Sequence, residues 1–158
     1  MAEHVFGMNV LSEYFLPLQE TSLDKALVDN LILWHDMAEA LVDDMTTITK
    51  TDEHRKLETE AEAKLASEAP LHMQEELKET FSIYEAQEAP EAKFVKAIDK
   101  LEPLFQIRFL STKITFKEDL KKHKRTAEIL NKYQSNRIKY IEAFPEILKF
   151  SEVLGDVG

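Results

Sequence analysis

The sequence contains no cysteine, which excludes a disulfide framework, a thiolate metal site and a cysteine nucleophile. Glycine and proline are scarce, at 3 and 5 of the 158 residues, so a turn-rich β architecture is not expected. No apolar run approaches the roughly 20 residues of a membrane span, and the N-terminus lacks the basic and apolar regions of a signal peptide. These absences predict a soluble, cytoplasmic protein.

Basic side chains are fewer than acidic ones in this sequence. The sequence has 20 Lys and Arg against 30 Asp and Glu, which gives a formal net charge of -10. A protein of this charge repels a nucleic acid duplex and an anionic membrane surface, so neither is expected as a partner. The basic run at residues 121–125 follows Glu118 and Asp119, and a solvated helix face explains it better than a nucleic-acid contact.

The residues that are abundant favour helix. Hydrophobic content of 44% and charged content of 32% are typical of a globular protein, and a chain of 158 residues is one domain by the usual prior. The sequence predicts helices at about 2–16, 23–42, 52–67, 71–86, 90–113, 117–133 and 136–154. The predicted fold is therefore an all-α, single-domain helical bundle over residues 1–158.

Local signals set several helix boundaries. Thr21 or Ser22 with Asp24 provides an N-cap, and Pro90 suits the first position of a helix. Pro103 lacks the N–H that would bond one turn back, so a kink or a loosened turn is predicted there.

Imidazole and carboxylate side chains occur in an order that one divalent metal ion could use. His35 and Asp36 are adjacent, His4 lies upstream, and Asp99 lies far downstream. Imidazole nitrogen suits transition metals and carboxylate oxygen suits harder ions, so the set predicts a site for zinc, manganese, iron or cobalt. Four protein ligands leave room for water at an octahedral metal, which can make that water a nucleophile near neutral pH. The chemistry predicted from these residues is hydrolysis.

Each of these residues also has a simpler explanation when it is taken alone. A histidine on an apolar face is usually a satisfied core residue, and a His-Asp dipeptide occurs often by chance. However, His35, Asp36 and Glu39 share one side of a predicted helix, beside an apolar stripe where unpaired ionisable groups are costly. Asp44 extends the same acidic cluster into the loop predicted at 43–51. The combination favours a functional site.

The three segments that carry these residues resemble, in order, the motifs of the HD-domain phosphohydrolases, in particular the branch of small deoxynucleoside 5′-monophosphatases. They read AEHVFGMNVL, HDMAEALVDD and FVKAIDKLEP, and the resemblance covers roughly residues 2–110. The resemblance implies an HD-type fold in which one divalent metal ion is bound by His4, His35, Asp36 and Asp99. The candidate metals are Mn, Co, Zn, Fe, Ni and Mg. As in the family, Lys-Leu-Glu follows Asp99.

The family also has a glutamate three residues after the aspartate of its His-Asp pair, and an aspartate five residues after that glutamate. Glu39 and Asp44 match these positions, which implies that Glu39 is the acid/base group and that Asp44 orients it. The implied activity is metal-dependent hydrolysis of a nucleoside 5′-monophosphate or a similar small phosphate ester. A homodimer is compatible with the resemblance, although no sequence feature shows one.

The sequence departs from the family pattern in two places. Asp43 stands where the family has glycine, and its charge is expected to weaken phosphate binding. The nucleotidase branch carries a helix and an Arg-x-Gly-Trp-like segment upstream of its first histidine, whereas this sequence begins just before His4. A truncated N-terminus, a misassigned start and a shortened relative are the alternatives.

Two other functions stay open. The first is an HD hydrolase of a nucleoside triphosphate or an alarmone nucleotide, which would need more cationic side chains than Lys50, Arg55 and Lys96 supply. The second is a regulatory module that binds a metal without catalysis, against which the presence of Glu39 and Asp44 argues. Turnover by metal-replete protein separates an enzyme from such a module, because a structural metal would raise thermal stability without giving product.

Overall fold

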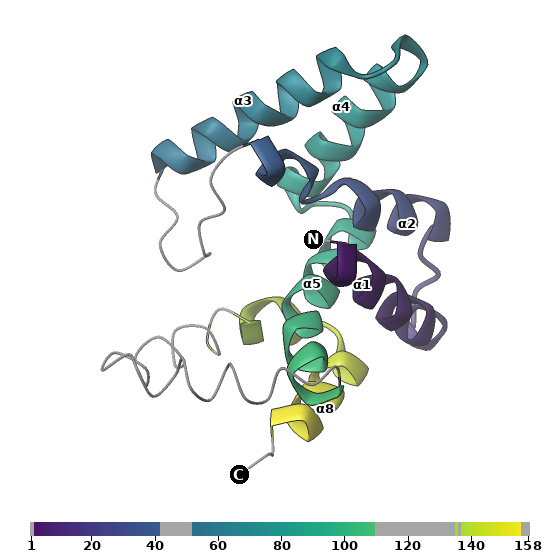
Figure 1. The fold of residues 1–158 in the computed structure, drawn as a ribbon. Helices are drawn as coiled ribbons and strands as arrows, with labels where there is room; N and C mark the ends of the chain where they lie inside the picture. The colour runs from purple at the N-terminus through teal and green to yellow at the C-terminus, as the bar shows by residue number, and fades with distance from the viewer. Residues whose placement is uncertain (1, 42–51, 110–134, 136, 156–158) are drawn as a thin grey trace, which may run out of the picture. The chain divides into compact units, whose positions relative to one another are not determined.

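The computed structural model describes residues 2–41, 52–109, 135 and 137–155. Within these ranges the chain is almost entirely helical and contains no β-strand, which confirms the all-α class. Figure 1 shows the elements, which are α1 (Ala2–Phe15), η1 (Leu16–Leu18), α2 (Lys25–Trp34), η2 (Met37–Leu41), α3 (Asp52–Glu68), α4 (Leu71–Ala86), α5 (Pro90–Phe109) and α8 (Pro145–Gly155). None of the described helices is both long and apolar enough to cross a membrane.

The contacts between Cα atoms divide the chain into two compact units. The first unit consists of Met1–Leu23 and Lys93–Gly158, and the second unit is Asp24–Ala92. The first unit therefore contains α1, η1, most of α5, and α8.

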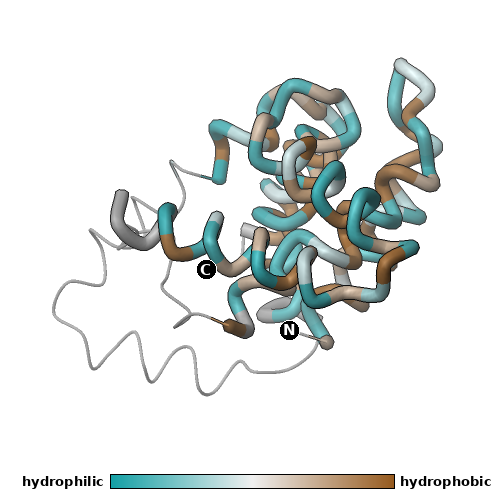
Figure 2. Tube along the Cα trace, turned by 90° about the horizontal axis from the view of Figure 1, so that it is seen from above, coloured by the Kyte–Doolittle hydropathy of each residue, from teal (hydrophilic) through white to brown (hydrophobic). Residues whose placement is uncertain are grey.

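The core of the first unit comes from the apolar faces of α1, α5 and α8. Met8, Leu11 and Phe15 recur at helical spacing along α1 and are buried, because these positions fall on one side of the helix. The Phe15 ring meets the ring of Phe150 on α8 edge to face, with centroids 5.4 Å apart. Hydrophobic and hydrophilic stretches alternate along the helices in Figure 2, as amphipathic packing requires.

Two prolines act differently on the helices of the first unit. The helix α5 runs on through Pro103 to Phe109, so the proline does not end it. The helix predicted over 136–154 is instead divided, because the backbone turns at 142–144 and α8 begins at Pro145. Phe144 donates its N–H to Ile141 and accepts from the N–H of Leu148, so it lies at the boundary of both helices. Proline suits the first position of α8, where its missing N–H has no intrahelical role.

In the second unit, α3 and α4 pack together and α2 contacts α4. Ala66, Leu77 and Phe81 form a buried cluster, against which Trp34 at the end of α2 packs. Trp34 thus has a packing role in this unit. The helix α4 has the bounds that the sequence predicts, with Pro70 directly before its first residue.

The start of α2 depends on a side-chain cap. The Asp24 carboxylate accepts hydrogen bonds from the N–H groups of Ala26 and Leu27, at 2.9 and 3.4 Å. We expect Asp24→Ala to lower the free energy of unfolding of this unit by about 1 kcal/mol, because two helical N–H groups lose their acceptor. Urea unfolding followed by the fluorescence of Trp34 measures the change. Asp29→Ala, which removes an exposed aspartate from the same helix, should cost less than half as much.

Candidate metal centre

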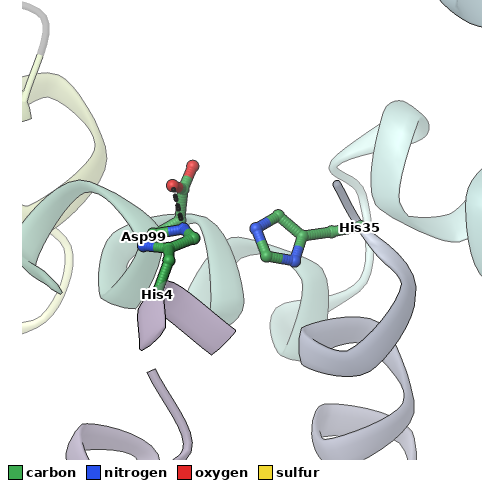
Figure 3. Close-up of side chains that lie close together, drawn as sticks. All are labelled: His4, His35 and Asp99. Atoms are coloured by element: carbon green, nitrogen blue, oxygen red, sulfur yellow. Dashed lines mark ion pairs between the residues drawn. The ribbon is translucent and has the colours of Figure 1, made fainter. Parts of the chain in front are cut away.

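His4 lies on the first turn of α1, beside two carboxylates of α5. Its Nδ1 is 2.6 Å from Glu102 Oε2, and its Nε2 is 3.5 Å from Asp99 Oδ1 (Figure 3). Because a carboxylate only accepts, Nδ1 donates its proton to Glu102. Asp99 and Glu102 can both reach His4 because residues three apart are neighbours on a helix surface. The structure thus brings together two residues, His4 and Asp99, that the sequence places far apart.

The Asp99 carboxylate is buried and surrounded by positive charge. Its Oδ2 lies 2.9 Å from Lys100 Nζ and 3.5 Å from Lys96 Nζ, while Oδ1 faces His4. These three cationic groups compensate the cost of burying a carboxylate. Lys96 reaches Asp99 because the two residues are three apart on α5.

The surroundings of His4 raise its basicity. Burial alone lowers the pKa of His4, but hydrogen bonds and charge attraction from Asp99 and Glu102 outweigh it and raise the pKa from 6.5 to about 10. Without a metal, His4 is therefore an imidazolium at neutral pH. A metal ion that binds Nε2 of His4 has to displace the proton on Nε2, whereas the Nδ1 proton stays with Glu102.

His35 lies where α2 ends, in the second unit. Its backbone N–H bonds to Leu31 O at 3.0 Å, and its ring Nδ1 donates to Ile32 O at 3.0 Å. Its Nε2 is 3.1 Å from Asp36 Oδ1, and the edge-to-face ring of Tyr84 is 5.3 Å away between centroids. The His35 side chain is fully buried, as its position on an apolar stripe predicts.

The α-helix predicted to carry His35, Asp36 and Glu39 on one side ends at Trp34. The chain turns at 35–36 and continues as the 3₁₀ helix η2, in which the N–H of Glu39 bonds to Asp36 O at 3.0 Å. This bond spans three residues, as in a 3₁₀ helix, and Asp36 itself belongs to the turn that precedes η2. Asp44 and Lys50 lie outside the described residues, as do the side chain of Arg55 and the helix predicted at 117–133.

The donor groups of both units suit a divalent metal ion. In each unit a histidine gives its Nδ1 proton to a protein acceptor and has its Nε2 beside an aspartate oxygen. Metal-binding histidines usually have this arrangement, in which a carboxylate or carbonyl holds the other ring nitrogen. His4 and Asp99 have ligand atoms close enough to bind one ion. Glu102 was not predicted as a site residue, although its spacing of three from Asp99 was a usable signal.

The raised pKa of His4 has a measurable consequence for stability. Between pH 6.5 and about 10 the folded state holds a proton on His4 that the unfolded state has lost. The stabilisation is therefore complete below pH 6.5 and is lost as the pH rises through about 10. We expect the free energy of unfolding of metal-free protein to fall by a few kcal/mol over this interval. Urea titrations at several pH values measure it, and an equal fall in His4→Asn would contradict the assignment.

The helical fold and the two histidine–aspartate pairs define an all-α protein with groups suited to a divalent metal. The HD domain family matches residues 1–139, so the chain belongs to the HD-domain family, whose members bind divalent metal ions.

Three relatives are similar over much of the chain. The 5′-deoxynucleotidase hdd1 of Schizosaccharomyces pombe is 35% identical over 127 residues, which cover 76% of this chain and 62% of the relative. The 5′-deoxynucleotidase HDDC2 of Bos taurus is 35% identical and that of Homo sapiens 34% identical, over 67% of this chain and 51% and 52% of the relatives. The chain thus spans between about half and three fifths of the length of these curated relatives.

Proposed function

We propose that this HD-domain protein is a divalent-metal-dependent phosphohydrolase that acts on a nucleoside 5′-monophosphate or a similar small phosphate ester. The observation that carries the proposal is the repeated pairing of a histidine Nε2 with an aspartate oxygen, on residues that match the HD motifs. The substrate class comes from the relatives, which are named 5′-deoxynucleotidases.

We propose that His4, His35, Asp36 and Asp99 hold one divalent ion, with Mn, Co, Zn, Fe, Ni and Mg as the candidates. The family match over residues 1–139 includes parts of both units, which supports a single HD domain over residues 1–158. A divalent ion lowers the pKa of bound water and polarises a phosphoryl oxygen.

The remaining roles belong to the protein's own side chains. We assign general acid/base catalysis to Glu39 and its orientation to Asp44, following the family pattern. Lys96 and Lys100 add positive charge next to Asp99, where an anionic phosphate would be attracted. A cytoplasmic location and a homodimer remain predictions.

Phosphate release tests the function directly. The protein is incubated with a panel of ribo- and deoxynucleoside 5′-monophosphates, with manganese, cobalt, zinc or a chelator. We expect release that requires metal and that differs among the nucleotides. Bound metal without release from any member of the panel would contradict the proposal and would favour a non-catalytic HD module.

A further inference from the structure

Glu102 is a buried carboxylate with one hydrogen-bond partner among the described residues. Only 1% of its surface is exposed, and its helix neighbours Ile98 and Leu101 are fully buried. Its Oε2 accepts the 2.6 Å bond from His4 Nδ1, whereas in the described part of the chain no donor reaches its Oε1. Burying a carboxylate is costly, so an apolar side chain would serve packing better. The contact with His4 is therefore the feature that a glutamate adds.

Gly7 on α1 gives this carboxylate its space. A Cβ atom at Gly7 would clash with Glu102 Oε1 and would lie 3.0 Å from its Cγ and Cδ. The backbone itself does not require glycine, because Gly7 has no positive φ, and glycine inside a helix costs about 1 kcal/mol relative to alanine. Gly7 follows His4 by three residues, so both lie on the same side of α1.

We propose that Glu102 is a positioning residue, which holds the His4 ring so that Nε2 faces the metal. The absence of a side chain at Gly7 leaves the space that the Glu102 carboxylate occupies. This inference rests on the proposed function, because it requires His4 to bind a divalent ion. A histidine whose Nδ1 donates to a carboxylate has only Nε2 available for coordination, and the carboxylate strengthens it as a ligand.

Zinc affinity of the full chain, measured by competition with a chromogenic chelator, tests the role of Glu102. Glu102→Gln keeps the size and a carbonyl acceptor for Nδ1, whereas Glu102→Leu removes the acceptor. We expect the leucine variant to bind zinc about 10- to 100-fold more weakly and the glutamine variant to lose less than about tenfold. Metal-free Glu102→Leu should lose stability at neutral pH, because its buried pair with the His4 imidazolium is broken, so zinc affinity is compared under conditions in which circular dichroism shows each variant folded.

The outcomes are distinct. A wild-type protein that binds no zinc would overturn this inference together with the proposed function. Wild-type binding with equal affinity in Glu102→Leu would overturn the inference alone. The nitrogen-15 shifts of His4 in zinc-loaded protein, assigned with His4→Asn, should show a protonated Nδ1 and a coordinated Nε2, and a metal-bound Nδ1 would also overturn it.

Gly7→Ala provides an independent variant that keeps both the histidine and the glutamate. It should also weaken zinc binding, because the new methyl group displaces the Glu102 carboxylate. In a Glu102→Ala background the space is open, so Gly7→Ala should cause little further loss. Ser12→Ala, a buried change on the same helix, is the matched control and should bind zinc as the wild type does. Equal affinity of Gly7→Ala and wild type would contradict the role of Gly7.

Discussion

Asp36→Asn should abolish metal-dependent phosphate release, with a loss on the order of 10³-fold or more. A bound metal supplies several kcal/mol of transition-state stabilisation, and each 1.4 kcal/mol corresponds to about tenfold in rate. Asparagine keeps the size of the side chain but removes the charge beside His35 Nε2. Initial rates with the best nucleotide of the panel, together with the metal content of the purified variant, measure the effect. Asp29→Asn, on the exposed side of α2, is the matched control and should retain full turnover.

The same loss is expected for Asp99→Asn, although Asp99 belongs to the other unit. If one ion is bound by all four proposed ligands, removing an aspartate from either unit should empty the same site. The wild type should then contain one metal ion per chain. Full turnover in one of the two variants would show that its aspartate is not a ligand and would contradict the four-residue set.

The helices could largely be predicted because apolar spacing and proline positions are local signals. Pro70 and Pro90 mark the starts of α4 and α5 in the sequence and in the structure. The end of α2 was missed because Ala38 and Leu41 continue a helical spacing into η2, and apolar spacing alone does not separate a 3₁₀ turn from an α-helix. The break before Pro145 was missed although proline is a strong boundary signal.

The candidate site depends on contacts that the sequence does not contain. The residue types of a metal site were visible, and the order of the three motifs supplied their grouping. The contact between His4 and Glu102 was not visible, because the two residues lie 98 positions apart, and the spacing of three between Asp99 and Glu102 indicated only that these two carboxylates share a side of the helix. The pairs His4–Asp99 and His35–Asp36 are observed contacts, whereas binding of one ion by all four residues stays a prediction.

Phe94→Ala should be among the most destabilising single changes in the first unit, at about 3–5 kcal/mol. Phe94 is fully buried on α5, and its ring meets Phe144 edge to face with centroids 5.8 Å apart. Truncation removes this contact and leaves a cavity that the helices fill only in part. Urea unfolding followed by far-UV circular dichroism measures the loss. Phe6→Ala is the control, because the Phe6 side chain is 70% exposed and its removal should change stability by no more than about 0.5 kcal/mol.

Metal should recover part of the stability lost in Phe94→Ala. The helix that carries Phe94 also carries Asp99, and an ion that binds only the folded chain stabilises it by mass action. At a free metal concentration of about 100 times Kd, the gain is about 2.7 kcal/mol. This gain should appear in Phe94→Ala, which keeps all four proposed ligands, and should be absent when Asp99→Asn is combined with it. Equal stabilisation of Phe94→Ala and of the double variant with Asp99→Asn would show that the ion binds somewhere other than the proposed centre.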